Sequence, residues 1–421
     1  MTHAHGAPTR RSRRRSPDED RTRRRVIVLL AACLVPVVAS LVAGAVALWP
    51  HSVDGNVDLP PGLGDTRGTR YVAARVLGVQ PFDCQGTGAG PGTSVQCGHV
   101  TARVTSGADK GRTVRVDVEP TVLRSGIERG DRLRLARFPA AGAQPAAYVF
   151  NDFQRARPMV ALAVTFAVLV IAVARLRGVA ALVGLVLSFL VLLRFMIPAL
   201  LSGESPLAVG LVGCASIMFV LLYLAHGVSI RTTTALFGTL FGLAASAALG
   251  TWAVQAAHLT GAGSEDDLVV AAVAGQVRLS GLLLCGIIVA SLGILNDVTV
   301  TQASAVWELH ALRPDSSARR LFAGAMRIGR DHIASTVYTI VFAYAGSALP
   351  VLLLIDLSQR PLGTVVTNEA LGEEAIRTLV GSIGLVLSVP LTTAVAVALV
   401  RFSRDRGPSL AAASAAVDPV R

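Results

Sequence analysis

Apolar segments of about 20 residues recur along most of this chain and constrain its fold more than any other feature. A helix of that length crosses the ~30 Å hydrocarbon core of a bilayer. Inside lipid each segment has to satisfy its own backbone hydrogen bonds, and these segments are too continuously apolar for barrel strands, so we expect helices. Eight segments are expected to span the membrane: Val26–Trp49, Met159–Ala174, Val179–Leu201, Pro206–Ala225, Leu236–Ala257, Leu279–Leu295, Ile333–Leu354 and Ile376–Val400.

The arginines predict the orientation of these helices, because basic loops resist translocation. The N-terminal tail Arg10–Arg25 is crowded with arginine and is expected to stay in the cytoplasm. Further arginines fill the long loop before His332 and follow the last segment. The loops Thr260–Asp267 and Asp356–Glu374 carry mostly acidic charge and are expected outside. Eight spans with both termini in the cytoplasm fit this distribution. We therefore expect a multi-pass protein of the cell (inner, cytoplasmic) membrane.

This topology divides the chain into five parts. The expected parts are a basic disordered cytoplasmic tail (1–25), a first transmembrane helix (26–49), an extracytoplasmic β-rich domain (50–155), a seven-helix transmembrane bundle (156–402) and a cytoplasmic tail (403–421). Small residues at Ala43 and Ala45 have the spacing of a signal-peptide cleavage site, so a cleaved signal is the alternative to a retained anchor.

The net charge of +12 does not indicate a nucleic-acid-binding protein. The positive charge lies mostly in the N-terminal tail and between the helices, not on one compact basic domain. We expect the lipid bilayer as a partner and no nucleic acid.

The outer segment has a different character, with short stretches rich in β-branched residues separated by Gly, Pro and Asp. About five strands are expected, forming a small barrel or sandwich that resembles an OB fold: Arg70–Val79, Val95–Val104, Gly111–Val118, Asp131–Arg137 and Ala146–Phe150. Cys84 and Cys97 flank a Gly-rich loop, and an extracytoplasmic location permits a disulfide between them. A metal site with His99 is the alternative, although two thiols and one histidine fall short of four ligands. No metal and no cofactor are expected.

Two helices of the bundle carry polar stripes. Steps of three and four residues from Gly286 place small residues first and polar residues after them on one helix face. The polar part of this stripe comprises Asp297, Thr301, Ser304 and Glu308. A second stripe contains His332 and Thr336, and we expect it to pack against the first, with Asp297 near one of these two residues. Polar groups inside a membrane bundle usually form pairs with one another, line a water-filled space or bind a cation. In the alternative interpretation, the first of these helices leaves the membrane near Leu295, and its acidic side chains are solvated.

Several stretches in order and spacing resemble the YibE/F family of bacterial membrane proteins. The resemblance rests on Tyr148–Arg155, Thr232–Gly242, Ser291–Val298 with Trp307–Leu309, and Tyr338–Gly346. This family usually has Gly-Ala-x-x-Asp around the acid, whereas Ile294 and Asn296 depart from that pattern here. The resemblance implies a multi-spanning membrane protein and supplies neither a substrate nor catalytic residues.

The sequence contains none of the common enzyme motifs, such as a Walker-type loop, His-Glu-x-x-His, Cys-x-x-Cys or Gly-x-Ser-x-Gly, so we do not expect an enzyme. The helix number and the polar stripes favour a permease-like transporter of a small solute or ion. The alternative is a non-transporting scaffold or sensor whose outer domain binds a protein partner.

Overall fold

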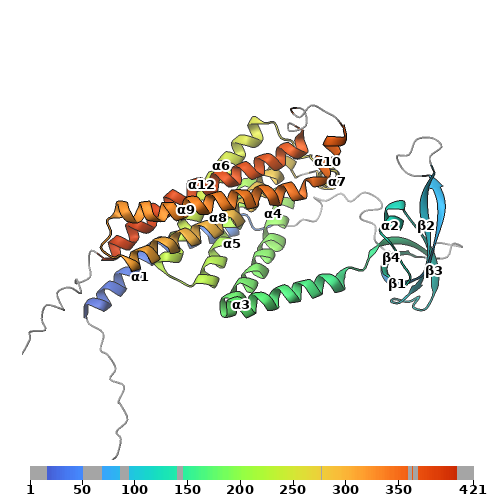
Figure 1. Ribbon diagram of the computed structural model, residues 1–421, viewed down its shortest axis with the longest axis horizontal. Coiled ribbons are helices and arrows are strands. Elements are labelled where there is room, and N and C mark those ends of the chain that lie inside the picture. Colours follow the sequence, from blue (N-terminus) through green and yellow to red (C-terminus); the bar gives the residue numbers. More distant parts are fainter. Residues whose placement is uncertain are drawn as a thin grey trace, which may run out of the picture. The chain divides into compact units, whose positions relative to one another are not determined.

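A computed structural model of the protein describes residues 17–50, 69–85, 94–139, 146–275, 277–358, 363 and 368–404 (Figure 1). Residues 1–16 and 405–421 of the expected tails lie outside the described residues, as does the segment 51–68. Residues 17–25, expected to belong to a disordered tail, instead form the first turns of the helix that begins at Pro17. The chain divides into two units, which are described separately: residues 59–173 form one, and residues 1–58 together with 174–421 form the other.

The smaller unit contains a five-stranded antiparallel sheet in the order β3-β2-β1-β4-β5. Its strands are β1 (Arg70–Gln85), β2 (Ser94–Val104), β3 (Thr113–Val118), β4 (Arg132–Phe138) and β5 (Ala147–Phe153). Strand alternation places the valines of β3 inside, where they join a core with Val72, Val100 and Leu133. The edge strands β3 and β5 contact each other, so the sheet curls toward a half-barrel.

All five strands expected from the sequence are present. The short helix α2 (Pro120–Arg124) lies between β3 and β4, and the strand order agrees with a partly open Greek-key barrel of the OB type. Cys84 and Cys97 form a disulfide between β1 and β2.

The larger unit is helical. Its elements are α1 (Pro17–Ala47), the second part of α3 (Ala156–Val191), the π-helical turn η1 (Leu192–Met196), α4 (Ile197–Leu201), α5 (Pro206–His226), α6 (Ile230–Ala256), α7 (Glu265–Val273), α8 (Leu279–Leu312), α9 (Ala318–Ser347), α10 (Leu349–Ser358) and α12 (Glu369–Arg404). The helix α8 is central, because it contacts α5, α6, α9 and α12 (Figure 1).

Close packing of α6, α8 and α12 depends on small residues. A Cβ atom on Gly238 would lie 2.0 Å from Oγ1 of Thr392, and one on Gly384 would lie 2.1 Å from Oγ of Ser246. A Cβ atom on Gly242 would likewise lie 2.4 Å from Leu295. These glycines therefore let the helix backbones approach one another, as small residues do in membrane bundles.

The expected number of eight spans is not confirmed. Among the described residues, five helices are long and apolar enough to cross a membrane, or six if α9 and α10 form one span. The apolar part of α1, Ala31–Ala47, is shorter than a full span. The 46-residue helix Ala156–Leu201 covers two expected segments, which fall on either side of Arg175, where the backbone leaves helical geometry at φ 55°.

The expectation of one continuous helix over Ile333–Leu354 is corrected. The helices α9 and α10 meet at an angle of 67° at Ala348. Pro350 lies in the first turn of α10, where its ring and its missing N–H prevent the preceding helix from continuing. The sequence contained this signal, because a proline interrupts the apolar run.

Candidate functional site

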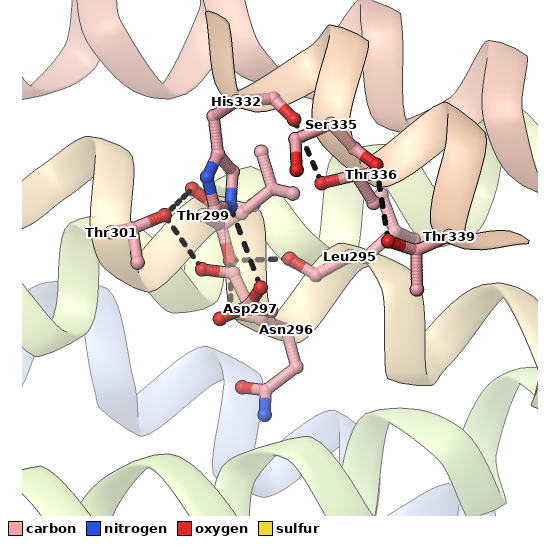
Figure 2. A network of polar contacts seen from close by, with 10 residues as sticks. Leu295, Asn296, Asp297, Thr299, Thr301, His332, Ser335, Thr336 and Thr339 are labelled. Atoms are coloured by element: carbon pink, nitrogen blue, oxygen red, sulfur yellow. Dashed lines mark hydrogen bonds and ion pairs between the residues drawn. The ribbon is translucent and has the colours of Figure 1, made fainter. Parts of the chain in front are cut away.

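The two expected polar stripes meet at one point. Nε2 of His332 on α9 lies 3.4 Å from Oδ2 of Asp297 on α8 (Figure 2). The side chain of Asp297 is 68% exposed and that of His332 is 32% exposed. The pair therefore joins two helices at the surface of the bundle and does not lie in its interior.

The other residues of these stripes interact locally. The hydroxyl of Thr301 donates to the carbonyl of Asp297 at 2.8 Å, and that of Thr336 donates to the carbonyl of His332 at 2.9 Å (Figure 2). Glu308 is exposed and lies 3.9 Å from Arg231, while Ser304 is half-buried. The structure brings Asp297 to His332 and leaves Ser304 and Glu308 farther along α8.

The position of Asp297 along its helix bears on its role. It follows Leu279, the first residue of α8, by 18 residues (297 − 279), which is about 27 Å at the helical rise per residue. That length is close to the thickness of the hydrocarbon core. A helix that enters the hydrocarbon at Leu279 therefore brings Asp297 to the opposite headgroup region, where an exposed acid is solvated.

The interior of the bundle holds a different set of polar residues. The hydroxyls of Thr239 on α6 and Thr299 on α8 share a buried hydrogen bond of 2.6 Å. Gln302 of α8 donates from Nε2 to Oγ1 of Thr393 at 2.7 Å and to the carbonyl of Ala325 at 3.0 Å. We call these the inner polar contacts. They link α8 to α6, α9 and α12 within the core.

The threonines among the inner polar contacts all have hydrogen-bond partners within the bundle. Thr393 donates to the carbonyl four residues earlier. Thr239 and Thr299 each have such a carbonyl within 2.9 Å, and one of the two hydroxyls donates to its carbonyl while the other donates across to its partner threonine. This pattern is typical of hydroxyls that are buried in a packed helix bundle. The inner polar contacts therefore hold helices together, and they close this part of the bundle.

The larger unit also contains a cavity of about 720 Å³, within the range of volumes of small-molecule sites. Gly286 and Ala290 of α8 form one side, and an ideal Cβ atom on Gly286 would meet no atom within 4 Å. The apolar wall is formed mainly by Leu192, Met196, Ile197, Leu200, Leu282 and Val289. The small residues that precede Asp297 on the α8 stripe thus leave open space.

The polar side of the cavity is provided mainly by the first turns of α12. Glu373 lines the cavity, yet its side chain is only 8% exposed. Its Oε1 atom is buried and has no hydrogen-bond partner among the described residues. The carboxylate packs against Gly263, where a Cβ atom would lie 3.1 Å from it. The cavity wall thus holds a buried acid with one unpaired oxygen, and Nε of Arg377 beside it is also buried without a hydrogen-bond partner among the described residues.

The neighbours of Glu373 leave the cavity acidic. Glu374 and Arg377 form an ion pair of 2.7 Å, with both side chains about three-quarters buried. Asp267 also lines the cavity, and its carboxylate accepts from the backbone N–H and hydroxyl of Ser264 at the start of α7. Tyr344 of α9 completes the polar side. Three acidic side chains thus face one basic side chain.

Sequence reasoning missed this site because it assigned Glu374 and its neighbours to an outer loop. The helix α12 begins at Glu369, earlier than the span expected at Ile376. Charged residues spaced by one and three positions, followed directly by a long apolar segment, indicate a helix whose first turns carry polar groups into the bundle. That spacing was the available signal for Glu373 and Arg377.

In the outer domain, His99 contacts Phe82 and Asp117. Its ring stacks on Phe82 at a centroid distance of 3.8 Å, and it pairs with Asp117 on the neighbouring strand. Across the described residues, no group of three or more His, Cys, Asp or Glu side chains is arranged to hold a metal ion. Cys84 and Cys97 are bound to each other.

The comparisons with known proteins agree with the resemblance seen in the sequence. The family described as YibE/F-like protein matches residues 162–402, which is more than half of the chain and contains α5–α9 and the whole cavity. No curated protein and no solved structure matches the chain. The apolar helices and this match identify a membrane protein that belongs to the YibE/F-like family.

Proposed function

We propose that this protein is a permease-like transporter that binds a small solute or ion in the cavity beside α12. The observation that carries the proposal is Glu373, a buried carboxyl group with an unpaired oxygen at the cavity wall. An unsatisfied buried acceptor is costly. A ligand that donates a hydrogen bond to Oε1 of Glu373 removes that cost. Ionisable groups inside membrane bundles mark substrate and ion pathways for the same reason.

The charge of the cavity favours a solute with a positively charged or N–H donor group. Asp267, Glu373 and Glu374 are opposed only by Arg377 among the charged residues that line it. The opposite wall is apolar and suits a hydrocarbon body. We therefore expect small organic amines to bind better than carboxylates or neutral molecules of the same size.

Transport requires the cavity to open to the other side of the bundle. The inner polar contacts and the glycines Gly238, Gly242 and Gly384 hold α6, α8 and α12 closely packed beyond the cavity. A relative movement of these helices is the step that would open a path, as in transporters that work by alternating access. In this proposal the protein is not an enzyme, its termini are cytoplasmic, and its β domain lies outside.

Uptake by proteoliposomes tests the proposal. A panel of labelled primary amines, carboxylates and alcohols of equal carbon number should give saturable uptake of amines only. Glu373→Gln keeps the shape of the side chain and removes its charge, and it should reduce amine uptake about tenfold or more, because a hydrogen bond to a charged group contributes about 1.5–3 kcal/mol. Glu265→Gln, on the exposed first turn of α7, is the matched control and should transport normally.

Two results would contradict the proposal. The first is uptake by Glu373→Gln that equals that of the unmodified protein, because the buried carboxylate would then be dispensable. The second is the absence of uptake of every member of the panel by protein that is folded and correctly inserted.

A further inference from the structure

The outer surface of the β domain carries a dense group of arginines. The residues that alternate with the buried valines and leucines point away from the core, and five of them on β1–β4 are exposed arginines. We call this surface the arginine face. It comprises Arg75, Arg103, Arg115, Arg132 and Arg134.

Three of these arginines form a row across neighbouring strands. Arg75 of β1 is directly opposite Arg103 of β2 on one side and Arg132 of β4 on the other. Neighbouring strands are only about 4.8 Å apart. Like charges directly opposite each other destabilise a sheet, so this row is unfavourable unless an anion lies against it.

The sheet itself supplies no such anion. Elsewhere in the domain, Arg137 is paired with Asp109 and Arg155 with Asp152. In the described part of the chain, by contrast, no carboxylate oxygen lies within 4 Å of Arg75, Arg103 or Arg132. Arg75 donates a hydrogen bond from its Nε atom to the carbonyl of Gly130 at 3.2 Å. The guanidinium groups of the row are therefore available to an external partner.

The chain itself keeps this domain near a membrane surface. The strand β5 ends at Phe153 and α3 begins at Ala156, so two residues connect the sheet to a helix that qualifies as a membrane span. A connection of that length reaches about 10 Å. The phosphate groups of lipids are then the nearest concentrated source of anions, and guanidinium groups bind phosphate through two parallel hydrogen bonds.

We propose that the arginine face binds the headgroups of anionic phospholipids. The row Arg103–Arg75–Arg132 provides several phosphate contacts at one strand spacing. The proposal rests on this row, because Arg134 is opposite Asp152 on β5 and Arg115 is two positions from Asp117 on β3. Binding replaces repulsion among guanidinium groups with attraction to the lipid surface. The inference is independent of transport, because it concerns only the β domain.

A spin label on the arginine face tests this inference in the full-length protein. The label is placed by Thr113→Cys, opposite Arg103 on β3, with Cys33, Cys214 and Cys285 replaced by alanine. The protein is reconstituted in nanodiscs of phosphatidylcholine alone or with phosphatidylglycerol. Relaxation of the label by a lipid-anchored nickel chelate reports contact with the bilayer surface. We expect strong relaxation with phosphatidylglycerol, and its loss in high salt.

Charge variants distinguish binding by the arginine face from a general attraction of a basic domain to an anionic membrane. In Arg75→Gln/Arg103→Gln/Arg132→Gln, the lipid-bound population should fall about fivefold for each arginine removed. Arg70→Gln/Lys110→Gln/Arg124→Gln changes the net charge equally, at positions outside the row, and should behave like the parent protein. Replacement of the three row residues by lysine keeps the charge and should retain most of the binding. The Cys84–Cys97 disulfide, detected by mass spectrometry, reports that each variant has folded.

Three outcomes would overturn the proposal. One is relaxation that does not depend on phosphatidylglycerol, and another is an equal loss in both glutamine variants. The third is binding of soluble polyphosphate to the arginine face without any response to anionic lipid, because the partner would then be a soluble polyanion.

Discussion

Single residues decide how closely the helices of the bundle pack. Gly238 of α6 has no room for a side chain, since its Cβ atom would lie 2.0 Å from Oγ1 of the fully buried Thr392. Gly293 of α8 is also a helical glycine, but nothing lies within 4 Å of its Cβ position. Gly238→Ala should therefore destabilise the protein by about 1–3 kcal/mol through overpacking. Gly293→Ala should be neutral or stabilising by up to about 1 kcal/mol, because alanine favours the helix. Thermal unfolding of both variants in detergent, each compared with the parent protein, checks this contrast, and equal unfolding temperatures would show that α6 and α12 are not in close contact at Gly238.

At the scale of elements, the turn between β2 and β3 is tied to the far side of the sheet by Asp109. Its carboxylate accepts hydrogen bonds from Tyr148 of β5 and Arg137 of β4, and these interactions lower the pKa of Asp109 below its usual value. A lowered pKa means that the folded state favours the ionised form of Asp109. The contribution of this carboxylate to the stability of the folded domain is therefore complete above about pH 5. The contribution is lost as the pH falls below about 4 and through the lowered pKa. Asp109→Asn should therefore speed hydrogen exchange in β4 and β5 at neutral pH, whereas parent and variant should converge in acid. The measurement uses the full-length protein, with exchange rates corrected for the intrinsic effect of pH, and a difference that persists unchanged in acid would exclude this electrostatic origin.

At the scale of the whole molecule, the arginine distribution predicts one orientation in the membrane. After Cys33, Cys214 and Cys285 are replaced by alanine, Lys110→Cys in the β domain and Glu265→Cys at the start of α7 should react with an impermeant maleimide from outside intact cells. Ser316→Cys, in the arginine-rich connection between α8 and α9, should react only after the membrane is permeabilised, because basic loops remain in the cytoplasm. External labelling at Ser316 would refute the proposed orientation and the eight-span count together.

The sequence by itself determined the class of protein and the elements of its outer domain. Lipid imposes a length and an apolar character on every spanning helix, and a half-buried strand alternates regularly, so both signals are local and can be read along the chain. For this reason all five strands were predicted, four of them with both ends within about three residues, while β1 continues to Gln85. The apolar segments were found as helices, but several of their bounds were wrong and the number of spans is not confirmed. The YibE/F-like family was also recognised from short stretches such as Ser291–Val298. Gly238 and Gly242, four residues apart on α6, have a local spacing typical of helix packing, and both lie in close helix contacts.

Only the tertiary structure decided which polar residues face the interior. Asp297 and Glu308 attracted attention because they are charged, yet they lie on the exposed side of α8, while Thr299 and Gln302 lie inside. A helical period distinguishes one face from another but does not say which face meets other helices when nearly every position is apolar. The cavity beside Glu373 arises from α4, α7, α8, α9 and α12 together. Its depth and its unpaired carboxylate depend on contacts between residues more than 100 positions apart, which no local pattern contains.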